Sequence, residues 1–155
     1  MDINLVDALT SAQRVTARSL AERLAEEDAG VDQWRVLRVI GASAGVAMGS
    51  LAEQVQIPAP SLTRLVDSLV DRALVYRRQS VTDRRRIDVH LSENGHKLLG
   101  RLESIAADHQ AAMQQRLGRD ALSAMITFLE AIQEEYARPV SATPPGEPAS
   151  LPSPV

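Results

Sequence analysis

Apolar residues recur at helical spacing through most of the chain. From residue 3 to about residue 27 there is no proline or glycine, and leucines and alanines repeat every three or four positions. This pattern predicts one long helix that ends at Gly30. A shorter helix is expected over residues 33–40, with Asp32 as its N-cap.

Two short helices are predicted next, after a glycine-containing loop over residues 41–49 that has a short extended stretch near Val46. The first covers residues 50–55 and is broken by Ile57–Pro58. The second opens at Ala59–Pro60, where proline is tolerated in the first turn. Its leucines and valines follow the spacing of a buried stripe. The opposite, polar side of this helix carries Ser61, Arg64 and Ser68.

The hydrophobic period then changes from that of a helix to that of a strand. Residues 74–78 form a short segment that contains β-branched and aromatic residues. Further along, Ile87, Val89 and Leu91 alternate with polar residues. Alternation of this kind indicates half-buried strands. The polar segment 79–86 between them predicts a hairpin loop whose tip is rich in arginine.

Two more long helices are predicted after the hairpin. Ser92 is a suitable N-cap for the first, and Gly118 separates it from the second. From Pro139 onward, six of the eight prolines of the chain fall within 17 residues that contain no aromatic side chain. Such a composition predicts a disordered tail over residues 139–155.

The expected fold class is mainly α with a small β-hairpin wing: a winged helix-turn-helix with N- and C-terminal dimerisation helices. Residues 1–138 would form a single domain, with a DNA-binding lobe at about 33–91. The helices at about 3–28 and 92–138 have apolar stripes wider than one short helix could cover. We expect them to pack against each other and against a second copy, as a homodimer.

Composition narrows the possible functions. Hydrophobic residues make up 45% of the chain, charged residues 24% and aromatic residues 3%, which suits a helical globular protein. No run of about 18 apolar residues is present, and the N-terminus resembles no signal peptide, so we expect a cytoplasmic protein. There is no cysteine, which excludes disulfides, thiolate metal sites and thiol-based redox sensing. We expect no cofactor and no metal.

Charge is distributed unevenly along the chain. The formal net charge is −3, yet the segment from Pro58 to Leu91 has seven arginines against four acidic residues. A local basic zone in an acidic protein is typical of a phosphate-binding surface. A helix that enters the major groove of DNA needs small polar residues and an arginine on its free face. The candidate DNA-binding residues of the helix are Ala59, Pro60, Ser61, Thr63, Arg64 and Ser68.

The arginines at the hairpin tip make DNA the favoured partner. They would repel one another without an anionic partner, and a guanidinium at the end of a wing is shaped to enter the minor groove. Asp83 beside them is expected to structure the wing through an ion pair, with Arg85 or Arg72. The candidate DNA-binding residues of the wing are Arg77, Arg84, Arg85 and Arg86.

Several motifs at a specific joint spacing resemble the winged helix-turn-helix of the MarR (multiple antibiotic resistance regulator) family. They are residues 50–78 (SLAEQVQIPAPSLTRLVDSLVDRALVYRR), 83–86 (DRRR) and 91–95 (LSENG). The resemblance implies a homodimer that reads an inverted repeat, with a recognition helix beginning at Pro60 and Arg85 in the minor groove. Two positions depart from the family pattern: Pro60 stands where a small polar residue is common, and Ala73 where a glycine is common.

The resemblance also implies a small aromatic or anionic effector bound between the dimerisation helices and the DNA-binding lobe. Arg14 and Trp34 are the candidates for such a site, although a single tryptophan is more often a core residue and Arg14 could pair with Glu22 or Asp28. His109, on an apolar stripe, is expected to be a hydrogen-bonded interface residue rather than a ligand or pH sensor. A ligand-responsive repressor is therefore the favoured function, since repression needs no activating surface.

Two other classes of function were weighed. An enzyme is not expected, because the three histidines have no metal-ligand spacing and there is no phosphate loop or nucleophile motif. The alternative is a helical dimeric adaptor or antirepressor that acts through protein–protein contacts without DNA. Such an adaptor would explain the long helices but leaves the arginine tip without a role. The operator, the regulated genes and the effector cannot be inferred from the sequence.

Overall fold

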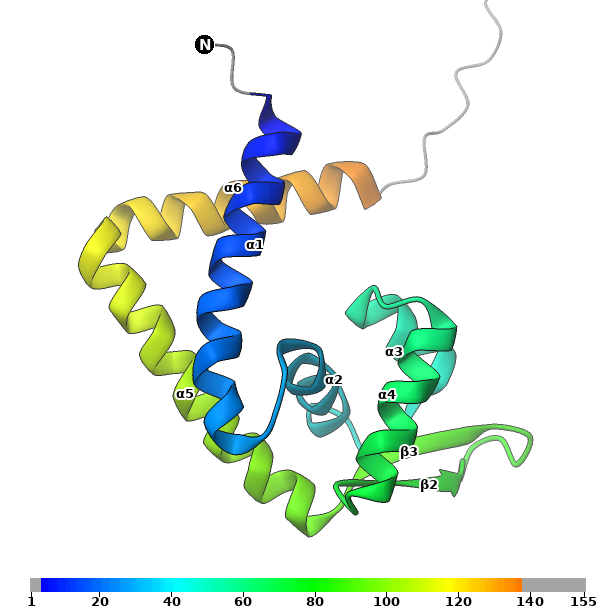
Figure 1. Ribbon diagram of the computed structural model, residues 1–155. Helices are drawn as coiled ribbons and strands as arrows, with labels where there is room; N and C mark the ends of the chain where they lie inside the picture. Colours follow the sequence, from blue (N-terminus) through cyan, green and yellow to red (C-terminus); the bar gives the residue numbers. More distant parts are fainter. Residues whose placement is uncertain (1–3, 138–155) are drawn as a thin grey trace, which may run out of the picture. The chain divides into compact units, whose positions relative to one another are not determined.

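The computed structural model describes residues 4–137, and the Pro-rich segment 139–155 lies outside them. The predicted element order and fold class are confirmed (Figure 1). The elements are α1 (Leu5–Leu24), the 3-10 helix η1 (Ala25–Glu27), α2 (Val31–Gly41), β1 (Val46–Ala47), α3 (Met48–Val55), α4 (Ala59–Asp71), β2 (Val75–Gln79), β3 (Ile87–Leu91), α5 (Glu93–Leu117) and α6 (Arg119–Ala137).

The chain divides into two compact units, one up to Ala112 and one from Met113. In the first unit α2 lies in the middle, with α1 and α5 on one side and α3 and α4 on the other (Figure 1). Val36, Leu37 and Ile40 of α2 are buried in a core that draws leucines and valines from every neighbouring element. Among the described residues, no helix is both long and apolar enough to cross a membrane.

The sheet contains one more strand than the predicted hairpin. β2 and β3 pair antiparallel from Val75 opposite Leu91 to Gln79 opposite Ile87, and β1 joins the other edge of β3 through Val46 opposite Val89. The short extended stretch expected near Val46 is therefore a strand. Because β1 comes directly before α3, this pairing ties the helix-turn-helix to the root of the wing.

The N-cap predicted for α2 is wrong by two residues. The helix begins at Val31 with Gly30 as its cap, because the side chain of Gln33 accepts the Gly30 N–H (3.0 Å) and the Gly30 carbonyl accepts the Trp34 N–H (3.0 Å). Asp32 lies in the first turn and pairs with Arg35 at 3.3 Å. A carboxylate in the first turn also interacts favourably with the helix dipole.

The turn between α4 and β2 is held against the start of α5. The Ser92 hydroxyl donates toward the carbonyls of Ala73 (2.7 Å) and Leu74 (3.0 Å), and it accepts the Gly95 N–H (3.0 Å), which confirms Ser92 as the cap of α5. A Cβ on Gly95 would lie 2.0 Å from the Leu74 carbonyl oxygen, so only glycine permits this approach. Ala73 itself has φ +54°, in the left-handed region.

Replacing Ala73 with glycine should raise the free energy of unfolding by about 0.5–1 kcal/mol. The left-handed conformation costs an L-residue about 1–2 kcal/mol, and glycine avoids this cost while losing more backbone entropy. Ala111→Gly is the matched control, because Ala111 is exposed and lies in the interior of α5. The control should lose about 0.5–1 kcal/mol in urea unfolding. A loss in both variants would contradict the strain at Ala73.

Candidate nucleic-acid interface

One side of α4 is exposed to solvent and polar at its centre. Leu62, Val66 and Leu69 are fully buried, which directs the other side of the helix to solvent. All six of the residues that the sequence singled out here are exposed, namely Ala59, Pro60, Ser61, Thr63, Arg64 and Ser68. The helix opens with Pro58 as N-cap, and the Thr63 hydroxyl donates to the Ala59 carbonyl at 2.9 Å.

The wing loop is closed by hydrogen bonds that involve its own backbone. Ser80 N–H donates to the Arg86 carbonyl (2.8 Å), and Arg86 N–H donates to the Asp83 carbonyl (2.9 Å). The Asp83 carboxylate accepts the Arg85 N–H at 3.0 Å. The prediction that Asp83 forms an ion pair is therefore wrong. Its carboxylate accepts a backbone N–H instead, and Arg72 pairs with Asp28.

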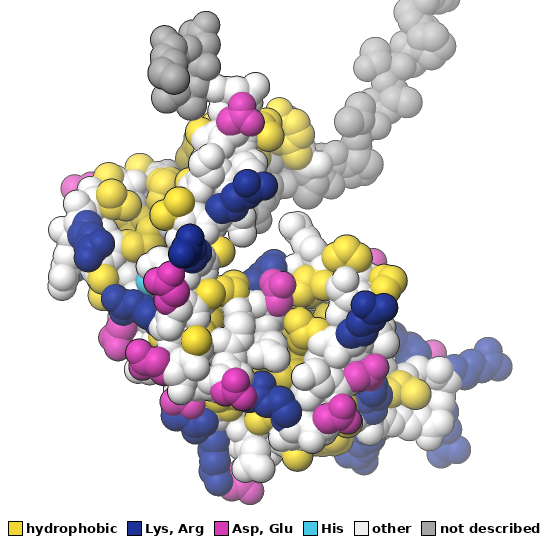
Figure 2. All heavy atoms as spheres, in the orientation of Figure 1, with side chains coloured by type: hydrophobic (Ala, Val, Ile, Leu, Met, Phe, Trp, Pro, Cys, Tyr) yellow, Lys and Arg dark blue, Asp and Glu magenta, His cyan; other side chains and the backbone are white. Residues whose placement is uncertain are grey.

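The three arginines of the loop, Arg84, Arg85 and Arg86, are exposed, and none makes an ion pair within residues 4–137. Figure 2 shows their region as a cluster of basic side chains that extends beyond the body of the first unit. Three neighbouring cations without counter-ions on an ordered loop create a local positive potential that attracts an anion.

Arg77 differs from the arginines of the loop. Its guanidinium lies 2.6 Å from the Asp67 carboxylate on the exposed side of α4. This ion pair joins β2 to α4 and thereby sets the position of the wing relative to the helix. With its charge partly neutralised, Arg77 is better suited to positioning than to binding phosphate.

Two positions near this surface were missed by the sequence analysis. Ser50, exposed in the first turn of α3, lines a hollow of about 400 Å³ that it shares with Arg86 of the wing loop. Val81, within the loop, is 86% exposed. Neither had a signal in the sequence, because the hollow forms only when α3 and the wing meet in space.

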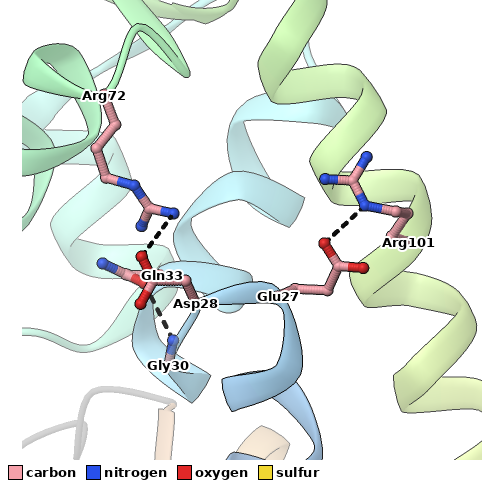
Figure 3. A network of polar contacts seen from close by, with 6 residues as sticks. All are labelled: Glu27, Asp28, Gly30, Gln33, Arg72 and Arg101. Carbon is pink, nitrogen blue, oxygen red and sulfur yellow. Dashed lines mark hydrogen bonds and ion pairs between the residues drawn. The ribbon is translucent and has the colours of Figure 1, made fainter.

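The turn between α1 and α2 contacts both α4 and α5. Asp28 lies 3.8 Å from Arg72, the C-cap residue of α4, and Glu27 lies 2.7 Å from Arg101 of α5 (Figure 3). Adjacent acidic residues on one turn thus hold the end of α4 on one side and α5 on the other. Asp28 has φ +53°, which turns the chain between the two contacts.

The structure does not bring the two candidate ligand residues to one hollow. Trp34 faces α5, where its indole N–H donates to Glu103 (3.2 Å) and Arg38 lies over its ring at 5.2 Å. Arg14 is exposed on α1, while the ion pairs considered for it are made by other arginines, Arg18 with Glu22 and Arg72 with Asp28.

An open hollow of about 770 Å³ lies between α1 and α2. Its lining includes Arg18 of α1 and Gln33 and Arg35 of α2, and contains neither Arg14 nor Trp34. Within the described residues, no cluster of acidic or histidine side chains could hold a metal ion.

His109 is a buried residue between α5 and α1. Its Nε2 lies 3.2 Å from the Ser19 hydroxyl. Burial lowers the pKa of His109, and the nearby positive charge of Arg23 lowers it further. The folded protein therefore favours the neutral imidazole.

These features define a winged helix-turn-helix protein: an exposed helix after a short helix and a tight turn, followed by a hairpin with a basic loop. A family model described as "MarR family" matches residues 27–86. The HTH-type transcriptional regulator FarR of Neisseria gonorrhoeae is 30% identical over 90 residues. The aligned region covers 58% of this chain and 62% of FarR, so it spans less than two thirds of that relative.

Two solved structures of the transcriptional repressor CouR have the same fold. One, bound to a 23-mer DNA duplex, is 28% identical with a TM-score of 0.78 and covers 83% of this chain and 92% of that one. The other, bound to p-coumaroyl-CoA, is 26% identical with a TM-score of 0.77 and covers 85% and 93%. Residues 27–86 therefore resemble the MarR family, and the described residues share the fold of CouR.

The lowered pKa of His109 predicts that stability falls in mild acid. Below about pH 6.5 the unfolded chain takes up a proton at this residue before the folded protein does. The free energy of unfolding should therefore be insensitive to His109 above about pH 7 and decrease as the pH falls toward 5. Urea unfolding of the wild type and of His109→Gln at several pH values measures this, and an equal decrease in both would contradict it.

Proposed function

We propose that this protein is a transcription regulator that binds double-stranded DNA through α4 and the wing. The observation that carries the proposal is the ordered loop with three exposed arginines that lack counter-ions, set next to the free side of α4. A helix in the major groove and a basic wing in the minor groove is a combination that suits this geometry. The name of FarR and the DNA-bound structure of CouR support it.

We further propose that the regulator is a homodimer that binds an inverted repeat. Large apolar side chains are exposed on α1, at the end of α5 and along α6, and burying them against a second copy would remove them from water. A two-fold dimer presents two wings and two copies of α4, which matches two half-sites. The exposed apolar residues are Leu5, Val6, Val15, Leu117, Met125, Ile126, Phe128 and Tyr136.

The regulator is proposed to be a repressor that responds to a small aromatic or anionic effector. CouR is a repressor with a structure bound to p-coumaroyl-CoA, which supports this role by similarity. In this chain the hollow between α1 and α2 is the site we propose; its cations, Arg18 and Arg35, pair with Glu22 and Asp32 at 3.3 Å, so an anionic group would have to displace these carboxylates. This assignment replaces Arg14 and Trp34, because the hollow is lined by other residues.

Arg85→Ala should weaken binding to a palindromic duplex selected from a random-sequence pool by about 1–3 kcal/mol. The loss of one phosphate-neutralising or groove-inserted cation should also reduce the slope of log affinity against log salt by about 1. Fluorescence anisotropy at several salt concentrations measures both quantities.

Arg14→Ala is the matched control, since Arg14 is an exposed arginine of α1 that lies outside the proposed effector site. It should bind DNA like the wild type. Equal effects of the two substitutions would remove the wing from the interface. Absent or salt-insensitive binding by the wild type would instead favour the adaptor function.

Asp83→Ala tests whether the loop conformation matters more than its charge. Removing an acid beside DNA would by itself strengthen binding, but this variant also loses the acceptor for the Arg85 N–H. We expect affinity to fall by about fivefold, which corresponds to one lost hydrogen bond of about 1 kcal/mol. Asp83→Asn keeps an acceptor oxygen without the charge and should bind at least as tightly as the wild type. Identical behaviour of the two variants would contradict the role of the bond.

A further inference from the structure

The exposed beginning of α4 is apolar, although it lies within a polar and basic surface. Pro58 is the N-cap, and Ala59 and Pro60 are the next two residues; all three are exposed. Thr63, one turn later, is exposed as well. A recognition helix usually presents small polar groups at this end, so the exception calls for a physical explanation.

Few hydrogen-bond donors remain at this end of the helix. Pro58 and Pro60 have no N–H, so they remove two of the amides that a helix N-terminus normally directs at an anion. The Thr63 hydroxyl donates its proton to the Ala59 carbonyl at 2.9 Å, so Thr63 offers its methyl group rather than a donor. Apart from the exposed hydroxyl of Ser61, the surface consists of a methyl group, proline rings and a second methyl group.

This apolar patch, formed by Ala59, Pro60 and Thr63, lies next to the residues that would bind DNA. Arg64 follows Pro60 by four positions and therefore lies on the same side of the helix. When α4 enters the major groove, the patch faces the edges of base pairs. The one apolar group on those edges is the C5-methyl group of thymine.

We propose that this patch recognises thymine methyl groups, so that each half-site contains at least one thymine read through its methyl group by Ala59, Pro60 or Thr63. The inference rests on the proposed DNA-binding function and adds the chemistry of the bases recognised. A polar residue in place of Pro60 would read a hydrogen-bonding group instead. This chain thus exchanges a hydrogen bond for an apolar contact at that position.

The test replaces thymine with deoxyuridine, which lacks only the C5-methyl group. In the selected palindromic duplex, each thymine of the half-site is replaced in turn, on both halves symmetrically. At one or two positions we expect affinity to fall about fourfold per methyl group, the factor that corresponds to the burial of one such group. Thymines outside the half-sites serve as controls and should show no effect.

Thr63→Ser is the matched protein variant, because it keeps the hydroxyl and its bond to Ala59 and removes only the methyl group. Ala59→Gly removes the other methyl group. For one of these two variants, or for Pro60→Ser, the uracil that weakens wild-type binding should have no further effect. If the uracil substitution lowers affinity by the same factor in all three variants as in the wild type, the assignment of the contact is overturned.

The outcomes separate this inference from the proposed function. Salt-dependent binding to a selected duplex, with no position sensitive to uracil, would overturn the thymine contact and leave the DNA-binding function intact. A pool from which no duplex is enriched would overturn both. Circular dichroism of each variant verifies that the helix is retained.

Discussion

The close approach of α5 to the Leu74 carbonyl holds α4 and the wing together. At this point the end of α4, the start of β2, the end of β3 and the first turn of α5 meet within one set of hydrogen bonds made by Ser92. The approach requires a glycine at position 95, since a Cβ there would overlap the carbonyl oxygen. The recognition helix and the wing thus share one anchor, and the strain at Ala73 is the local cost of the turn that reaches it.

The arginines of the lobe fall into two groups that differ in their partners. Arg77 and Arg72 are engaged by carboxylates on other elements, Arg77 closely at 2.6 Å and Arg72 loosely at 3.8 Å. The arginines of the loop have no carboxylate partner within the described residues, and Asp83 orders their loop through a backbone amide. An acid in the wing loop is therefore compatible with the proposed DNA binding, because one of its acceptor oxygens is used within the loop.

Periodicity predicted the elements well because each pattern reflects burial on one side of a helix or strand. The start of α4 at Ala59 and the strand Ile87–Leu91 match the prediction. Partners across the fold could not be predicted in this way. Asp83 was paired with the wrong group, and the cap of α2 is Gly30, whose N–H is accepted by Gln33 three residues later, a capping-box spacing that the choice of Asp32 overlooked. The hollow between α1 and α2 excludes Trp34 because that side chain turns toward Glu103 of α5.

The two contacts at the C-terminal end of α4, one at Leu74 and one between Asp28 and Arg72, differ in strength. The contact at Leu74 is tight and based on short bonds to the backbone, whereas Asp28 reaches Arg72 only at 3.8 Å with its side chain fully exposed. An exposed pair of this kind contributes little to stability, so it can separate at little cost. The hollow between α1 and α2 includes Gly30 and Val31, directly after this turn. A ligand in that hollow would act on the weak Asp28–Arg72 pair at the C-terminal end of α4. It would leave the tight contact at Leu74 in place. The position of α4 relative to α1 is then the degree of freedom through which an effector would influence DNA binding.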